Sequence, residues 1–322
     1  MAGVMIAAPK SGSGKTMITC GLLKLLNRRG WNPAPFKCGP DYIDGLFHNQ
    51  VLGLESGNLD SFFEEPDHMR EKISHITPGC FVVAEGVMGY FDGLGGISVK
   101  ASSWEISQIL ELPVILVVDA KGASLSLAAQ VKGFLEYVPR DEGGKEIKCV
   151  SRIGGVLFNR ISPMIYGRIK ALVEEQLHVP VIGYVPELGF LQVGSRHLGL
   201  VLDEIDGLKE QMERLADCME NTVDLDVLAM VCGGKEKMGQ SGSGMPGHRT
   251  QPGQADSGMT HPAQPGQKDS CSAHTPMPRC GKDRTTSVPH TCEKSTDRKF
   301  SLGVALDEAF CFYYRDNLDA LE

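Results

Sequence analysis

The 322-residue chain has 42% hydrophobic and 22% charged residues and a formal net charge of −8. This composition excludes a collagen-like, coiled-coil or wholly disordered protein, and the acidic balance predicts no nucleic-acid partner. No apolar run approaches the roughly 18 residues that a membrane span needs, so no membrane partner is expected. The ten cysteines form no regular framework and accompany no export signal, which predicts reduced thiols in a cytoplasmic protein.

Strand and helix signals alternate through residues 1–232. The predicted strands are Gly3–Ala8, Ala34–Lys37, Cys80–Ala84, Val114–Asp119, Gly155–Phe158 and Val181–Val185. The predicted helices are Thr16–Arg29, Ser103–Leu110, Ser124–Tyr137, Tyr166–Gln176 and Glu204–Met219. Near-continuous apolar strands joined by amphipathic helices indicate an α/β fold with a doubly wound, mostly parallel sheet. Ligands of such sheets bind beyond the carboxyl ends of the strands.

A glycine-rich loop separates the first predicted strand from the first predicted helix. It reads Pro9-Lys10-Ser11-Gly12-Ser13-Gly14-Lys15-Thr16, a P-loop in which Pro9 replaces the first glycine. P-loops bind phosphates with backbone N–H groups, a lysine and a hydroxyl that ligates Mg²⁺. We therefore predict that ATP binds through Ser11, Gly12, Ser13, Gly14, Lys15 and Thr16. Whether Lys10 contacts nucleotide or solvent stays open.

Carboxylates follow the second and third predicted strands. Asp41 and Asp44 come after a Gly-Pro turn, Glu85 follows four apolar residues as in a Walker B strand, and Asp92 lies in the next glycine-rich loop. An anionic nucleotide beside a second anion requires a divalent cation. We predict catalytic roles for Lys15 and these four carboxylates, and Mg²⁺ ligation by Thr16, Asp41 and Glu85. For Asp44 and Asp92 the alternative is an aspartate that caps its own loop.

These motifs, together and in this order, resemble the cobyrinate a,c-diamide synthase family over essentially all of residues 1–232. Besides the phosphate loop, the matching segments are Pro35-Phe36-Lys37-x-Gly39-Pro40-Asp41-Tyr42-Ile43-Asp44, Asn58-Leu59-Asp60, Glu85-Gly86-Val87-Met88-Gly89-x-x-Asp92-Gly93, Val117-Val118-Asp119, Asn159-Arg160 and Arg196-His197-Leu198-Gly199-Leu200.

The resemblance implies a P-loop synthetase domain, similar to dethiobiotin synthetase, followed by a class I glutaminase. It implies ATP-dependent amidation of the a and c acetate carboxylates of cobyrinate, a tetrapyrrole of cobalamin biosynthesis, through an acyl phosphate. Asn159 would face the adenine edge, or else form only a strand-end turn. Arg196 and His197 would contact substrate carboxylates or phosphate, or would only hold a loop. Family members tend to self-associate, which leaves a homodimer open.

A compositionally different segment follows residue 232. From Gly233 to Lys299 there is no Leu, Ile, Phe, Tyr or Trp, but ten Gly and seven Pro, so a disordered low-complexity linker is predicted. Residues 300–322 resemble the truncated beginning of the family's glutaminase domain. Because no cysteine stands in a nucleophile elbow, we expect this chain to use free ammonia, or to receive nitrogen from glutamine through a separate glutaminase chain.

Three alternatives remain from the sequence. Nickel-sirohydrochlorin a,c-diamide synthase performs the same chemistry on another tetrapyrrole, and no residue separates the two. Dethiobiotin synthetase shares the fold, but the Gly-Pro-Asp-Tyr-Ile-Asp segment and the C-terminal residues count against it. A MinD-like switch ATPase is favoured only by Lys10, and no amphipathic C-terminal membrane helix is visible.

Overall fold

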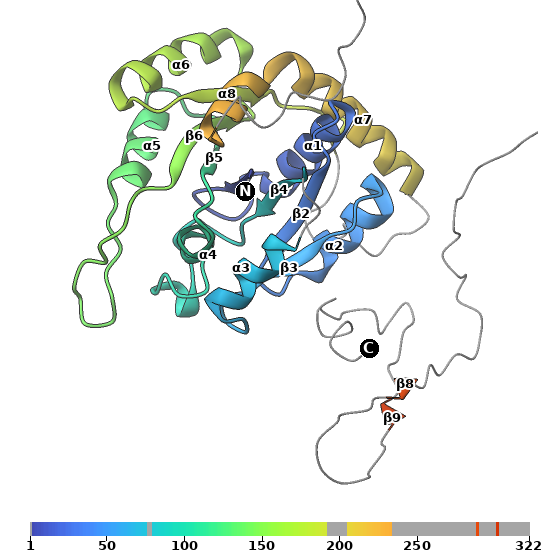
Figure 1. Cartoon of the computed structure of the whole chain (residues 1–322). Helices are drawn as coiled ribbons and strands as arrows, with labels where there is room; N and C mark the ends of the chain where they lie inside the picture. The colour runs from blue at the N-terminus through green and yellow to red at the C-terminus, as the bar shows by residue number, and fades with distance from the viewer. Residues whose placement is uncertain (1, 76–78, 192–204, 234–287, 290–300, 303–322) are drawn as a thin grey trace, which may run out of the picture. The chain divides into compact units, whose positions relative to one another are not determined.

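The computed structural model describes residues 2–75, 79–191, 205–233, 288–289 and 301–302. Its main feature is a parallel sheet with strand order β3-β2-β4-β1-β5-β6-β7 (Figure 1). The strands are β1 (Gly3–Ala7), β2 (Pro33–Cys38), β3 (Gly57–Leu59), β4 (Phe81–Glu85), β5 (Val114–Asp119), β6 (Ile153–Asn159) and β7 (Val181–Val185). The predicted doubly wound α/β fold is confirmed.

Helices cover both faces of this sheet (Figure 1). One face carries α1 (Lys15–Arg28), the π-helix η1 (His48–Leu52), α7 (Ile205–Thr222) and α8 (Leu225–Val231). The other face carries α3 (Pro66–Ser74), α4 (Ser103–Leu110), α5 (Ser126–Glu136) and α6 (Pro163–Leu177). Two short elements, α2 (Tyr42–Phe47) and the 3₁₀-helix η2 (Leu94–Gly96), lie in the connections after β2 and β4.

The sheet is buried because its strands are apolar on both sides. In β1, Met5 and Ala7 belong to the core under α3 to α6, whereas Val4 and Ile6 belong to the core under α1 and α7. Successive side chains of a strand point to opposite faces, so a continuous apolar run supplies both cores. This is the pattern on which the sequence prediction depends.

Within residues 2–233, the elements that were not predicted are α2, η1, β3, α3, η2 and α8. β3 has three residues, and α3 buries only Met69 and Ile73, so neither produces a strong periodic signal. α8 begins one turn after α7, where the Asp224 carboxylate accepts hydrogen bonds from the Asp226 and Val227 N–H groups at 3.0 Å. Because β3 was missed, Glu85 ends the fourth strand rather than the third, and Asn159 ends the sixth rather than the fifth.

Most of the predicted linker and glutaminase beginning lie outside the described residues. Within them, β8 (Val288–Pro289) and β9 (Ser301–Leu302) form one antiparallel pair. The domain boundaries at residues 232 and 299 therefore stay predictions. Among the helices that the structure describes, none is long and apolar enough to cross a lipid bilayer.

Candidate active site

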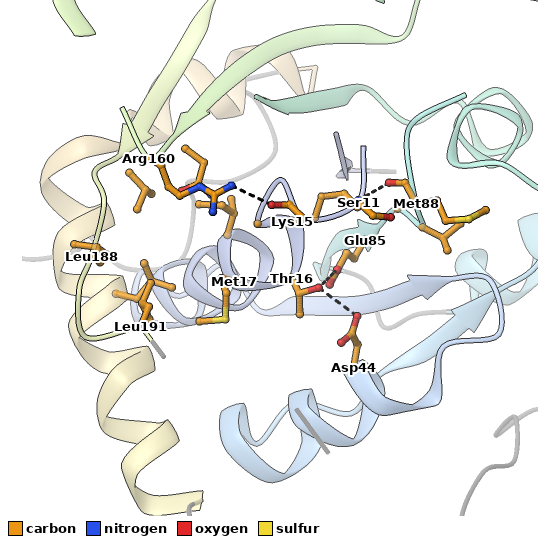
Figure 2. Close-up of a pocket in the computed structure, with 18 of the residues that line it drawn as sticks. Ser11, Lys15, Thr16, Met17, Asp44, Glu85, Met88, Arg160, Leu188 and Leu191 are labelled. Carbon is orange, nitrogen blue, oxygen red and sulfur yellow. Dashed lines mark hydrogen bonds between the residues drawn. The ribbon is translucent and has the colours of Figure 1, made fainter. Parts of the chain in front are cut away.

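The carboxyl ends of β1, β2, β4, β6 and β7 surround a cavity of about 710 Å³. Its lining combines the phosphate loop, the acidic strand ends and an apolar wall: Ser11, Gly12, Gly14, Lys15, Thr16, Met17, Ile18, Lys37, Asp41, Asp44, Glu85, Gly86, Val87, Met88, Asn159, Arg160, Val185, Pro186, Glu187, Leu188, Leu191 and Leu215. The parallel sheet thus brings together residues that are far apart in sequence (Figure 2). This is the edge at which a ligand was expected.

The phosphate loop adopts a conformation that only glycine accommodates easily. Gly12 and Gly14 have φ angles of 76° and 88°, in the left-handed region. A Cβ at Gly14 would lie 2.2 Å from Asn159 Nδ2. Ser13, which does not line the cavity, donates from Oγ to the Lys10 carbonyl at 2.9 Å. Helix α1 begins directly after this loop with no acidic residue in its first turn, so its N-terminal N–H groups favour an anion in the cavity.

Lys15 is buried at the centre of the site, with 8% of its surface exposed. Its Nζ donates a hydrogen bond to the Met88 carbonyl (Figure 2). Burial lowers the pKa of Lys15 to about 8, although the nearby carboxylate of Glu85 opposes this shift. A bound triphosphate would supply the anionic partner that the buried ammonium otherwise has only in part.

This pKa predicts that nucleotide binding depends on pH, with ATP as the expected ligand. As the pH rises above about 8, an increasing fraction of the free protein lacks the Lys15 proton, and binding of the triphosphate must restore it. We expect the Kd for ATP to rise by about tenfold between pH 7.5 and 9.5, with proton uptake at the higher pH in calorimetric titrations in buffers of different ionisation enthalpy. Lys15→Met should bind weakly and show neither effect. Equal parent affinity at both pH values would contradict the assignment.

Carboxylates surround a second buried lysine, Lys37, which is 4% exposed. Its Nζ contacts Asp44, lies 2.7 Å from Glu85 Oε1 and is 3.7 Å from Asp41 Oδ2. The sheet register creates this cluster, because Lys37 and Glu85 are partners on the adjacent strands β2 and β4. Burial alone would lower the pKa of Lys37, but Glu85 and Asp44 raise it above its ordinary value. The sequence prediction assigned no site role to Lys37.

Burial and the adjacent Glu85 carboxylate raise the pKa of Asp44. Asp44 is nearly inaccessible to solvent, whereas the side chain of Asp41 is 38% exposed. Asp41 and Asp44 therefore lie close together in sequence, but Asp44 is buried and Asp41 is partly exposed to solvent.

Oxygen atoms suitable for Mg²⁺ lie beside the phosphate loop. The Thr16 hydroxyl donates to Glu85 Oε1 at 2.7 Å and lies 3.4 Å from Asp44 Oδ2 (Figure 2). Glu85 is fully buried, and its Oε2 has no hydrogen-bond partner. Among the described residues, no three Asp, Glu, His or Cys side chains form a metal centre by themselves. Mg²⁺ beside a nucleotide needs only one or two protein oxygens plus phosphate and water, so these residues fit the ion.

Asp92 is the predicted catalytic residue that does not line the cavity. It is exposed, is not among the described residues that line the cavity, and its Oδ2 accepts a hydrogen bond from the Gly89 N–H at 3.0 Å. This contact is the loop cap that the sequence left as the alternative. A catalytic role of Asp92 stays a prediction.

Asn159 and Arg160 hold the phosphate loop from the end of β6. Asn159 Nδ2 donates to the Ser13 carbonyl at 2.9 Å, and Arg160 Nη2 donates to the Gly12 carbonyl at 3.1 Å. Arg160 also pairs with Asp119; burial opposes the charged form of Asp119, but the Arg160 hydrogen bond keeps the pKa of this carboxyl below its ordinary value. The contact of Asn159 with the adenine edge stays a prediction.

The wall opposite Glu85 is apolar, and the sequence prediction missed it. Met17, Leu188 and Leu191 lie there (Figure 2), with Leu215 contributed by α7. Such a wall suits the ring of a nucleotide base. Because these residues come from separate elements, no local sequence motif predicts them. Arg196 and His197 lie outside the described residues.

Comparison with known proteins identifies the family of this chain. The family model described as the CobQ/CobB/MinD/ParA nucleotide binding domain matches residues 4–198. The chain is 36% identical over 323 residues to a cobyrinate a,c-diamide synthase of Listeria innocua, covering 99% of this chain and 59% of that protein. It is 42% identical over 235 residues to a hydrogenobyrinate a,c-diamide synthase of Brucella ovis, covering 72% of this chain and 51% of that protein.

The chain thus spans little more than half the length of these curated relatives. Among solved structures, the MinD cell division protein of Aquifex aeolicus matches with a TM-score of 0.40 and 17% identity, covering 69% of this chain and 98% of that one. The family match covers more than half of the chain and includes the phosphate loop, both acidic strand ends and Asn159. The chain belongs to the CobQ/CobB/MinD/ParA nucleotide-binding domain family.

Proposed function

We propose that this chain is the synthetase part of an a,c-diamide synthase of cobalamin biosynthesis, which uses ATP to activate the a and c acetate carboxylates of cobyrinate for amidation. The observation that carries the proposal is the cavity in which the Lys15 loop faces the buried carboxylates of Asp44 and Glu85. The names of the relatives support the tetrapyrrole substrate.

The chemistry requires activation because a carboxylate has no acceptable leaving group. Attack of a substrate carboxylate oxygen on the γ-phosphorus of ATP forms a carboxyl–phosphate bond and breaks the bond to the β-phosphate, releasing ADP. Ammonia then attacks the acyl carbon; phosphate leaves, a proton is lost, and an amide remains. Each acetate consumes one ATP and one ammonia.

The residues of the cavity have separate tasks in this scheme. Lys15 would exchange the Met88 carbonyl for the γ-phosphoryl group and stabilise its negative charge during transfer. Lys37 offsets the charge of Glu85 and Asp44, so that an anionic substrate can approach them. Mg²⁺ held by Thr16 and Glu85, with Asp41 as a further predicted ligand, would supply charge neutralisation at the phosphates.

The test is mass spectrometry of cobyrinate incubated with the full chain, Mg-ATP and ammonium chloride. We expect two successive replacements of a hydroxyl by an amine on cobyrinate. One ADP should be formed for each amide. Ammonium makes the assay independent of any glutaminase, and a parallel reaction with glutamine tests the nitrogen donor. Hydrogenobyrinate and nickel-sirohydrochlorin, run beside cobyrinate, determine which tetrapyrrole is used. ATP hydrolysis that responds to a protein partner but to no tetrapyrrole would refute the proposal.

A further inference from the structure

Four large apolar side chains are exposed in two loops on the substrate side of the sheet. Phe62 and Phe63 are 58% and 69% exposed, and Leu94 and Ile97 are 42% and 98% exposed. The first pair follows β3 and the second pair follows β4, so both loops leave the carboxyl edge that carries the cavity. Exposed apolar side chains that gather at one edge of a protein are typical of a binding surface. We call these four residues the apolar rim.

The loop after β3 is built to hold its two aromatic rings outward. The buried Asp60 accepts a hydrogen bond from the Phe62 N–H through Oδ1 at 2.9 Å, and its carbonyl accepts one from the Phe63 N–H at 3.1 Å. The two rings contact each other edge to face, with centroids 4.8 Å apart. The exposure of these rings is therefore a consequence of a defined turn.

A single carboxylate joins this loop to the loop after β4. Glu105, in the first turn of α4, accepts hydrogen bonds through Oε2 from Ser61 Oγ and from the Ala101 N–H, both at 2.7 Å. The strands β3 and β4 are separated by β2 alone, so their ends lie about 10 Å apart.

The loop after β4 links the cavity to the rim along the chain. Met88 lines the cavity, is 45% exposed, and begins the same loop that carries Leu94 and Ile97. Its carbonyl is the acceptor for Lys15. A tetrapyrrole whose acetate reaches Lys15 would leave most of its ring outside the cavity, and both rim loops leave this same edge of the sheet. The neighbouring charge of Glu64 is offset by Lys72, whose Nζ lies 2.6 Å away.

We propose that the apolar rim binds the face of the tetrapyrrole macrocycle and so presents an acetate side chain to Lys15 and Glu85. This inference rests on the proposed function, since it takes the tetrapyrrole as the acceptor. Phe62, Phe63 and Ile97 are then specificity-determining residues: they select a large flat macrocycle over a small aliphatic acid.

The test compares the full-length double variant Phe62→Ser/Phe63→Ser and the variant Ile97→Ser with the control Met164→Ser. Met164 is 86% exposed on α6, so its replacement removes exposed apolar surface elsewhere. We expect the KM for cobyrinate, and its Kd in absorbance titrations without ATP, to rise at least about tenfold in the rim variants. The KM for ATP should stay within about twofold of the parent, as should all constants of the control.

The outcomes separate the two proposals. If the parent is active and the rim variants have unchanged KM and Kd for cobyrinate, the proposed binding of the macrocycle by the apolar rim is wrong. The proposed function is then still intact. A loss of self-association in sedimentation experiments without a change in cobyrinate binding would also overturn it and assign the rim to a second copy of the chain. If the parent binds cobyrinate but does not amidate it, the proposed function is wrong. The titrations alone then show whether the apolar rim binds cobyrinate. A parent that neither binds nor amidates would overturn both.

Discussion

A Lys15→Ala variant is expected to lose ATP-dependent turnover by about a thousandfold or more while remaining folded. Lys15 is the buried cation between the phosphate loop and the Met88 carbonyl. During phosphoryl transfer no other side chain on α1 can deliver a positive charge to the same place. Removal of a preorganised charge from a site that excludes water costs far more than removal of the same charge from a surface.

The measurement is ADP release in the presence of cobyrinate and ammonium, with circular dichroism to confirm folding. Lys24→Ala is the matched control, because Lys24 lies on the same helix and its Nζ pairs with Glu213 on α7 at 2.6 Å. That variant should retain nearly full activity, since partly exposed pairs contribute little. Lys10→Ala, measured in the same series, would show whether the exposed lysine of the loop contacts nucleotide. Full activity of Lys15→Ala would remove the basis of the proposed mechanism.

A Lys37→Met variant is expected to lower the free energy of unfolding by about 3–5 kcal/mol. The side chain that replaces Lys37 fills similar volume but leaves the buried carboxylates of Asp44 and Glu85 without their shared cation. Two adjacent buried negative charges then repel each other in a medium of low dielectric constant. Because the pKa of Lys37 is raised above its unfolded value, this contribution is fully present below pH 10 and is lost only at still higher pH.

Urea denaturation of the parent and variant at pH 7.5 measures the effect. The control is Lys121→Met, which removes an exposed lysine whose Nζ lies 2.5 Å from Glu187; it should cost less than about 1 kcal/mol. Adding Asp44→Asn to Lys37→Met should recover part of the loss, because one of the unpaired charges is then gone. A Lys37→Met protein as stable as the parent, or no recovery in the double variant, would show that the cluster is not coupled in this way.

Elements with a strong local signal could be predicted with bounds within three residues of those in the structure. The helix Ser103–Leu110 and the strands Val114–Asp119 and Val181–Val185 have the predicted bounds. Each combines a clear period with a clear boundary, such as the Ser102 side chain that caps α4. The segment from Tyr42 to Ser74 was not divided into elements, because α2 and η1 are short, α3 is mostly polar and β3 has only three residues.

For the site, the sequence determined the phosphate loop, because a strand, two glycines with left-handed φ, a lysine and a helix start are consecutive in the chain. The sequence also predicted the carboxylates, since an Asp or Glu at the end of an apolar strand, or in the turn after it, is visible in the local sequence. Only the tertiary structure decided that Lys37 lies between these carboxylates, that the Met88 carbonyl holds Lys15, and that Leu188, Leu191 and Leu215 close the cavity. These contacts depend on the order β2-β4-β1 within the sheet and on the packing of α7 against α1. Strand order and helix packing are set by the burial of both sheet faces as a whole, and no stretch of neighbouring residues encodes them alone.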